Sequence, residues 1–143
     1  MLILAACAHD VVYDAIPGND EQRSADWARD WLSRSNLASV ADRVADLVLA
    51  TIKHSADPSD HAACALLDAD LAILGSPAED YGAYASAVRQ EYSAVPEDAW
   101  RTGRSRVLHS LLDRDRLYLT PAGRDRWEAQ ARRNLADELH RLT

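Results

Sequence analysis

The sequence predicts an all-α protein, a helical bundle of about six helices. Apolar residues recur at steps of three and four along most of the chain, which places them on one face of a helix. Proline, glycine and N-capping residues fall between these periodic segments, where helices end and begin. No region is rich in strand patterns, repeats or low-complexity sequence. The length of 143 residues indicates a single domain over 1–143.

The N-terminal half predicts three helices separated by short breaks. Residues 1–14 are apolar apart from one polar cluster and predict a helix that is buried on most sides. The breaker cluster 16–20 predicts a loop. Helices are then expected over 21–33 and 37–54, and their buried faces consist of Ala25, Ala28, Trp31 and Leu32 in the first, and Val40, Val44, Leu47, Val48 and Ile52 in the second.

The C-terminal half predicts three or more further helices. A helix over 60–75 would end at Gly75, and Ser76-Pro77-Ala78-Glu79 has the spacing of a capping box for a helix that reaches Tyr92. Pro96 opens the next helix, which runs to Leu112. Residues 113–120 form a connector, locally extended at 117–119, and Thr120-Pro121 caps a last helix whose apolar side is Trp127, Ala131, Leu135 and Leu139.

Charge and cysteine content narrow the class of protein. The net charge of −7 argues against a partner that is a nucleic-acid polymer, because phosphate contacts require a basic face. No apolar run approaches the roughly 20 residues that span a bilayer, so no membrane partner is expected. The apolar start is too short for a signal peptide, and no Lys or Arg precedes it. Cys7 and Cys64 lack CxxC spacing, so free thiols and a cytoplasmic location are expected.

One polar pair, His9-Asp10, interrupts the apolar N-terminal segment. A buried carboxylate is costly unless it is paired or bound to a metal ion. Later helices supply candidate partners in His54, Asp68 and Asp70. The two later carboxylates diverge by about 200° on a helix, so only one of them would face the site. Imidazole and carboxylate ligands indicate a divalent metal ion without choosing among Mn, Co, Ni, Mg, Fe and Zn.

Short stretches along nearly the whole chain carry a family resemblance. They begin with His9-Asp10-Val-Val-Tyr-Asp14 and continue, in order, at 19–25, 51–54, 67–75, 84–92, 103–108, 117–120 and 131–135. With these stretches the chain resembles the HD superfamily of metal-dependent phosphohydrolases, in a predicted bacterial branch of unknown substrate. The resemblance implies an HD-like helical bundle that hydrolyses a small phosphorylated substrate, such as a nucleotide, through a metal-activated water.

The same resemblance assigns roles to individual residues. His9 and Asp10 would be the central metal ligands, with Asp70 as the later one and Asp68 as its alternative. His54 would bind a second ion or contact the phosphate, although its place at a helix end also allows a capping role. Glu21 would orient the water, and Glu21 or Asp68 would take its proton. The phosphate charge would be neutralised by Lys53, Arg89 and Arg104, although salt bridges are an equal alternative for the two arginines.

The chain departs from the family at its start. The family's first histidine lies on a helical segment ahead of this sequence, so the chain resembles an N-terminally truncated member that lacks this ligand. Loss of one ligand weakens metal binding. The alternative function is therefore a catalytically impaired helical module for binding or interaction. The missing segment would also uncover an apolar face, which favours a homodimer.

Overall fold

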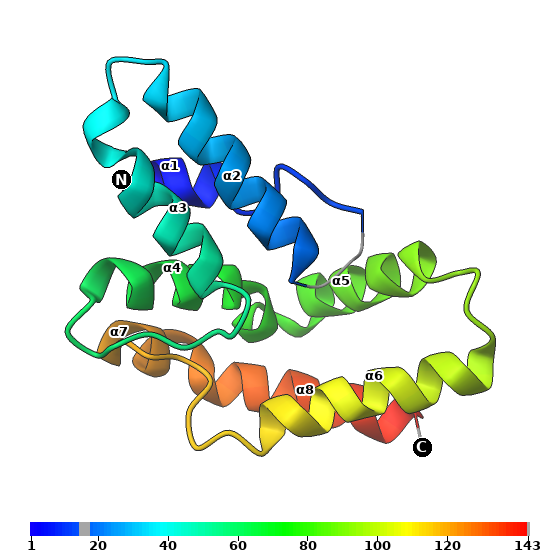
Figure 1. The fold of residues 1–143 in the computed structure, drawn as a ribbon. Coiled ribbons are helices and arrows are strands. Elements are labelled where there is room, and N and C mark those ends of the chain that lie inside the picture. The colour runs from blue at the N-terminus through cyan, green and yellow to red at the C-terminus, as the bar shows by residue number, and fades with distance from the viewer. Residues whose placement is uncertain (15–17, 143) are drawn as a thin grey trace. The chain divides into compact units, whose positions relative to one another are not determined.

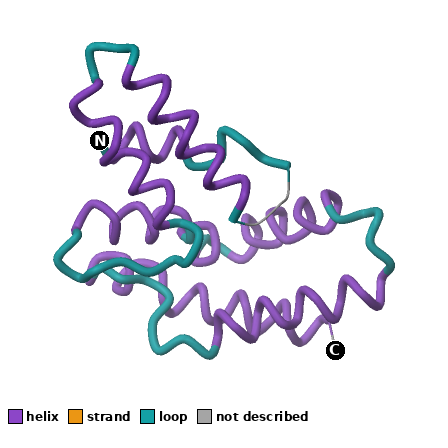
Figure 2. Tube along the Cα trace, viewed as in Figure 1, coloured by secondary structure: helices purple, strands orange, loops and turns teal. Residues whose placement is uncertain are grey.

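The structure, a computed structural model, describes residues 1–14 and 18–142. Within these ranges the chain forms helices joined by loops, and no strand occurs (Figures 1 and 2). The predicted all-α class is therefore confirmed. The loop predicted at 16–20 falls partly outside the described ranges, and Gly18 already serves as the N-cap of the next helix.

The chain divides into two compact units, Met1–Asp70 and Leu71–Thr143. Each unit has its own cluster of buried side chains. The single domain inferred from the length stays a prediction.

The N-terminal unit is built around a helical hairpin of α2 (Asn19–Ser33) and α3 (Ala41–Ala50) (Figure 1). A short 3₁₀ helix, η1 (Ala38–Val40), leads into α3, and α1 (Leu2–Ala8) and α4 (His61–Asp70) pack on the hairpin. The buried cluster is mostly aliphatic and includes Ala5, Ala25, Ala28, Leu32, Val44, Ala45, Leu47, Val48 and Leu66. The predicted apolar stripes of the two hairpin helices account for half of it.

The first helix is shorter and more exposed than the sequence predicts. It ends at Ala8 instead of continuing to residue 14, and Ile3 is 78% exposed. After the helix, side chains of α2 hold the backbone: Val12 donates its N–H to the Ser24 hydroxyl, and Asp14 donates its N–H to Asp20. These long-range bonds satisfy backbone groups that a longer helix would have bonded internally.

Two residues expected in the core lie at the surface. Trp31 of α2 is 52% exposed, and Ile52 is 40% exposed because α3 ends at Ala50. Trp31 stacks on Trp27, with ring centroids 5.8 Å apart. The periodicity correctly predicts an apolar face. At the edge of that face, however, no described residue packs over Trp31 and Ile52 to bury them.

The C-terminal unit consists of three long helices and short helical turns. Its elements are η2 (Ala72–Gly75, a 3₁₀ turn), α5 (Ala78–Glu91), α6 (Glu97–Leu112), α7 (Pro121–Gly123), η3 (Arg124–Glu128, a π-helical turn) and α8 (Ala129–Leu142). α6 and α8 pack together (Figure 1). Their buried cluster is Leu74, Tyr81, Leu108, Leu117, Tyr118, Ala131 and Leu135.

One of the two helix N-caps predicted in this unit forms in the structure, and the other does not. Thr120 does cap the helical segment that begins with α7 and continues through η3 into α8, since its hydroxyl accepts the N–H of Gly123 at 2.9 Å. The capping box at Ser76 does not form, because the Ser76 hydroxyl donates to the Ile73 carbonyl instead. Gly75 ends η2 and is required by packing, since a Cβ there would lie 2.5 Å from Cβ of Trp127.

Candidate functional site

Three side chains that are distant in the sequence converge within the N-terminal unit. Nε2 of His54 lies 2.7 Å from Oδ2 of Asp70, and Nε2 of His9 lies 3.4 Å from the other oxygen, Oδ1. Asp10 joins the group with Oδ2 at 3.1 Å from the same His9 nitrogen. The cluster thus consists of two imidazoles on one shared carboxylate, with a second carboxylate at its edge.

The end of α1 sets the position of His9. His9 is the C-cap residue, and its Nδ1 lies 2.9 Å from the carbonyl oxygen of Ala6. A carbonyl can only accept, so Nδ1 carries the proton, and Nε2 is the atom that faces the carboxylates. The sequence does not predict this contact, because it depends on the helix ending at Ala8; the i, i+3 spacing is its only signal.

The contact between His9 and Asp70 needs a cation. With Nδ1 protonated, a neutral His9 would point the Nε2 lone pair at the oxygen lone pairs of Asp70 and Asp10. A proton on Nε2 or a metal ion removes this repulsion. The hydrogen bond to Asp70 is the main reason that the pKa of His9 is raised to about 9, against the opposing effect of burial.

Asp70 ends α4 and carries the shared carboxylate. Burial acts to raise its pKa, but the hydrogen bonds and charges of His54 and His9 outweigh burial and hold the pKa well below its usual range. A cavity of about 290 Å³ adjoins the cluster and is lined by Ala6, His9, Leu66, Ala69 and Asp70. The cluster therefore borders a space that a small ligand group can enter.

His54 occupies an unusual backbone conformation. Its φ of 45° is the only positive φ among the described non-glycine residues. The left-handed region is disfavoured for side chains with a Cβ, and glycine is the usual residue there. The chain thus holds an imidazole where backbone energetics favour glycine, which is typical of a position kept for function.

This strain predicts an inverted order of stability for two substitutions. His54→Gly and His54→Ala both lose the bond to Asp70, but only glycine relieves the backbone. The glycine variant should be the more stable by about 1 kcal/mol in urea unfolding followed by circular dichroism. At Lys53, whose φ is not positive, alanine should be the more stable. Equal stability of the two His54 variants would contradict the argument.

Glu21 and Asp68 are the predicted catalytic carboxylates. Glu21, the third residue of α2, accepts the backbone N–H of the N-cap Gly18 at 2.6 Å and so stabilises the start of this helix. Asp68 is buried in α4 and is not among the residues that line the cavity beside Asp70. The carboxylate that the structure places against His9 from this helix is that of Asp70.

The predicted phosphate-binding residues are not bonded to the histidine cluster in the contacts described above. Lys53 precedes His54 and is exposed. Arg89 bonds Glu97 at 3.1 Å and the carbonyl of Tyr92, and Arg104 forms a buried ion pair with Glu138. Both arginines lie in the C-terminal unit and both form the salt bridges that were their structural alternative.

The donors are not assembled as a finished coordination sphere. Over residues 1–14 and 18–142, no group of three or more His, Cys, Asp or Glu side chains has the arrangement of a metal site. His9, His54 and Asp70 instead bond to one another directly.

Comparison with protein-family models, with characterised proteins and with solved structures finds no match for this chain. Among the described helices, none is long and apolar enough to cross a membrane.

Proposed function

We propose that the protein is a metal-dependent phosphohydrolase whose site is His9, Asp10, His54 and Asp70. The observation that carries the proposal is the orientation of His9. Its Nδ1 is committed to Ala6, and its Nε2 faces two carboxylates across distances that a metal ion, like a proton on Nε2, makes favourable. A ligating histidine whose other nitrogen bonds a backbone carbonyl is a recurrent feature of metal sites.

The donor set fits a divalent cation such as Mn²⁺, Co²⁺, Ni²⁺, Mg²⁺, Fe²⁺ or Zn²⁺. His9, Asp70 and Asp10 would hold the ion, and His54 would either join them or orient Asp70 through its 2.7 Å bond. When bound, the ion would supply Lewis-acid chemistry and lower the pKa of a water molecule.

The chain's own residues would position the substrate and move the proton. Asp10 is the most exposed member of the cluster, at 67%, so its carboxylate is the donor nearest to an entering water or phosphate. Lys53 is next to His54 in sequence and would neutralise phosphate charge. A small phosphorylated substrate, a nucleotide among them, fits this chemistry. The free thiols of Cys7 and Cys64 support a cytoplasmic location.

Hydrolysis of a nucleotide panel in the presence of Mn²⁺, Co²⁺ or Ni²⁺ tests the proposal. The wild-type chain should release phosphate only with added metal, and the double variant His9→Ala/Asp10→Ala should not. Identical rates for the wild type and the double variant would refute the activity for this chain.

A second candidate, a helical interaction module that pairs as a homodimer, is favoured by an apolar groove in the N-terminal unit. The groove has a volume of about 290 Å³, and its lining is Leu4, Cys7, Ala8, Trp27, Ala28, Trp31, Leu32 and Val44. Two stacked, half-exposed tryptophans are a large apolar surface to leave in water. A second copy of the chain would cover it.

Substitution of Trp31 should therefore change the oligomeric state. We expect the wild type to dimerise with rising concentration in analytical ultracentrifugation and Trp31→Glu to remain monomeric. Ile52→Glu places the same charge on an exposed apolar residue outside the groove and should behave as the wild type. The homodimer is refuted if Trp31→Glu associates as strongly as the wild type, or if the wild type is a monomer throughout.

A further inference from the structure

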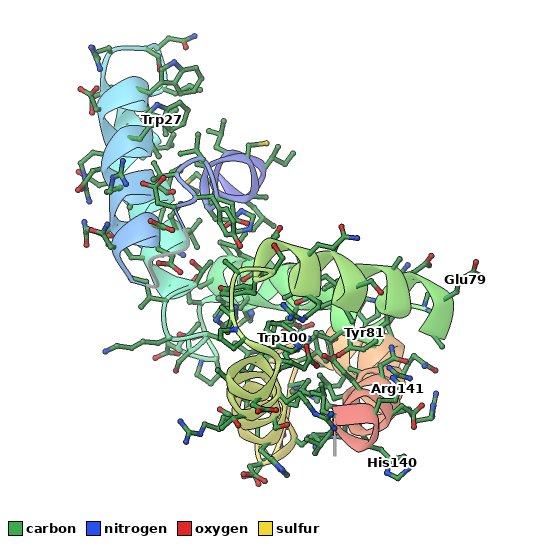
Figure 3. The ribbon with its side chains drawn as sticks, turned by 90° about the vertical axis from the view of Figure 1, so that its right-hand side faces the viewer. Trp27, Glu79, Tyr81, Trp100, His140 and Arg141 are labelled. Carbon is green, nitrogen blue, oxygen red and sulfur yellow. The ribbon has the colours of Figure 1, made fainter. Side chains whose placement is uncertain are left out.

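The C-terminal unit contains an open cavity of about 550 Å³ along one side of α5. This volume is within the range of small-molecule sites. Residues near the start of α6 and the end of α8 form the facing wall. Figure 3 shows Trp100, from α6, and Arg141, from α8, beside α5. We call this cavity the α5 trough.

Small side chains form the α5 wall of the trough: Ala78, Gly82, Ala85 and Ser86. A Cβ added to Gly82 would meet no atom within 4 Å, so the space above this glycine is open. Trp100 and Leu142 supply apolar surface on the facing side. The trough therefore has room for a flat apolar group lying against α5.

The charged side chains at the trough differ in how well a partner of opposite charge compensates them. Glu97 bonds Arg89, whose guanidinium also lies 5.2 Å from the ring centre of Trp100. Glu138 is bonded by Arg104 at 2.7 Å and by the hydroxyl of Tyr81. Both carboxylates are thus already compensated by an arginine.

Arg141 is the third guanidinium of the group. It interacts with Glu138 only electrostatically, and among residues 1–14 and 18–142 no hydrogen bond or ion pair engages it. Counted with Arg104, which does not itself line the trough but bonds Glu138, the group carries one excess positive charge in a chain whose net charge is −7. A guanidinium with open donors beside an apolar wall suits an oxyanion on an apolar body.

We propose that the α5 trough binds an organic anion, with an aromatic body between Trp100 and Gly82 and a carboxylate or phosphate on Arg141. This site goes beyond the proposed hydrolase, because all of its residues lie in the C-terminal unit and none belongs to the histidine cluster. Its failure would leave the hydrolase proposal unaffected.

Titration of the isotope-labelled chain by NMR tests the site with three probes, namely 2-naphthoate, 2-naphthyl phosphate and the neutral 2-naphthalenemethanol. Both anions should shift the signals of Gly82, Ser86 and the Trp100 indole. Arg141→Gln should weaken anion binding about tenfold and leave the neutral probe unchanged, because one charge-assisted bond is lost. The tighter of the two anions identifies the oxyanion as a carboxylate or a phosphate.

Two glycine variants provide a matched pair. Gly82→Leu fills the trough and should abolish the shifts. Gly103→Leu makes the same change at another open helical glycine, one that does not line the trough, and should bind as the wild type. Leucine favours helix over glycine, so both variants should fold. The proposal is overturned if no anion shifts these signals, if Gly82→Leu still binds, or if Arg141→Gln binds both anions as the wild type does.

Discussion

Asp70→Asn should lower the affinity of the chain for Mn²⁺ by about a hundredfold or more, since even changes beside a ligand cost about ten- to a hundredfold. Asparagine keeps the size of the side chain but removes the charge that both imidazoles share. Isothermal titration with Mn²⁺ measures the effect, and metal-dependent hydrolysis should fall in parallel.

Asp68→Asn is the matched control for this prediction. It makes the same change in the same helix, at a buried carboxylate that does not line the cavity beside His9. Its Mn²⁺ affinity should equal that of the wild type, provided that circular dichroism shows the fold intact. An equal loss in both variants, or no loss in Asp70→Asn, would mean that Asp70 is not the ligand.

Glu138→Gln should destabilise the C-terminal unit by about 3 kcal/mol, because removal of one partner strands a buried charge. The side chains of Arg104 and Glu138 are only 9% and 8% exposed, and Glu138 also accepts the Tyr81 hydroxyl. Urea unfolding measured by circular dichroism would show the loss. Glu97→Gln, which breaks the exposed pair with Arg89, should cost under about 1 kcal/mol.

The same carboxylate predicts a dependence of stability on pH. Burial acts to raise the pKa of Glu138, but the bonds from Arg104 and Tyr81 outweigh burial and lower the pKa. A lowered folded-state pKa gives stability that is full above the unfolded-state pKa and is lost as pH falls through the folded-state value. In acid, the unfolding free energies of the wild type and Glu138→Gln should therefore converge. A constant difference between them would contradict this assignment.

Local sequence patterns predicted most of the helices, because apolar periodicity and caps such as Thr120 act within a few residues. Helix ends that depend on distant groups could not be predicted in this way. α1 stops at Ala8 because the backbone at Val12 bonds Ser24 of α2, and no local signal records that contact. Trp31 has core spacing, but its exposure depends on whether another element covers it.

The candidate site was predictable in its residue types and not in its arrangement. The apolar surroundings of His9, Asp10 and Asp70 indicated a compensated cluster. Spacing left Asp68 and Asp70 as alternatives, and the structure places Asp70 between two imidazoles. The position of His54 depends on a turn with positive φ, a conformation that helical periodicity does not encode.

Binding of Co²⁺, followed by its visible absorption, tests the central claim most directly, because the spectrum reports nitrogen and oxygen ligands on the ion itself. We predict saturation at a single Co²⁺ per chain with an absorption distinct from that of the hydrated ion. The double variant His9→Gln/His54→Gln should show only the hydrated ion. A wild-type spectrum identical to that of hydrated Co²⁺, or an unchanged spectrum in the double variant, would contradict a metal site at His9, His54 and Asp70.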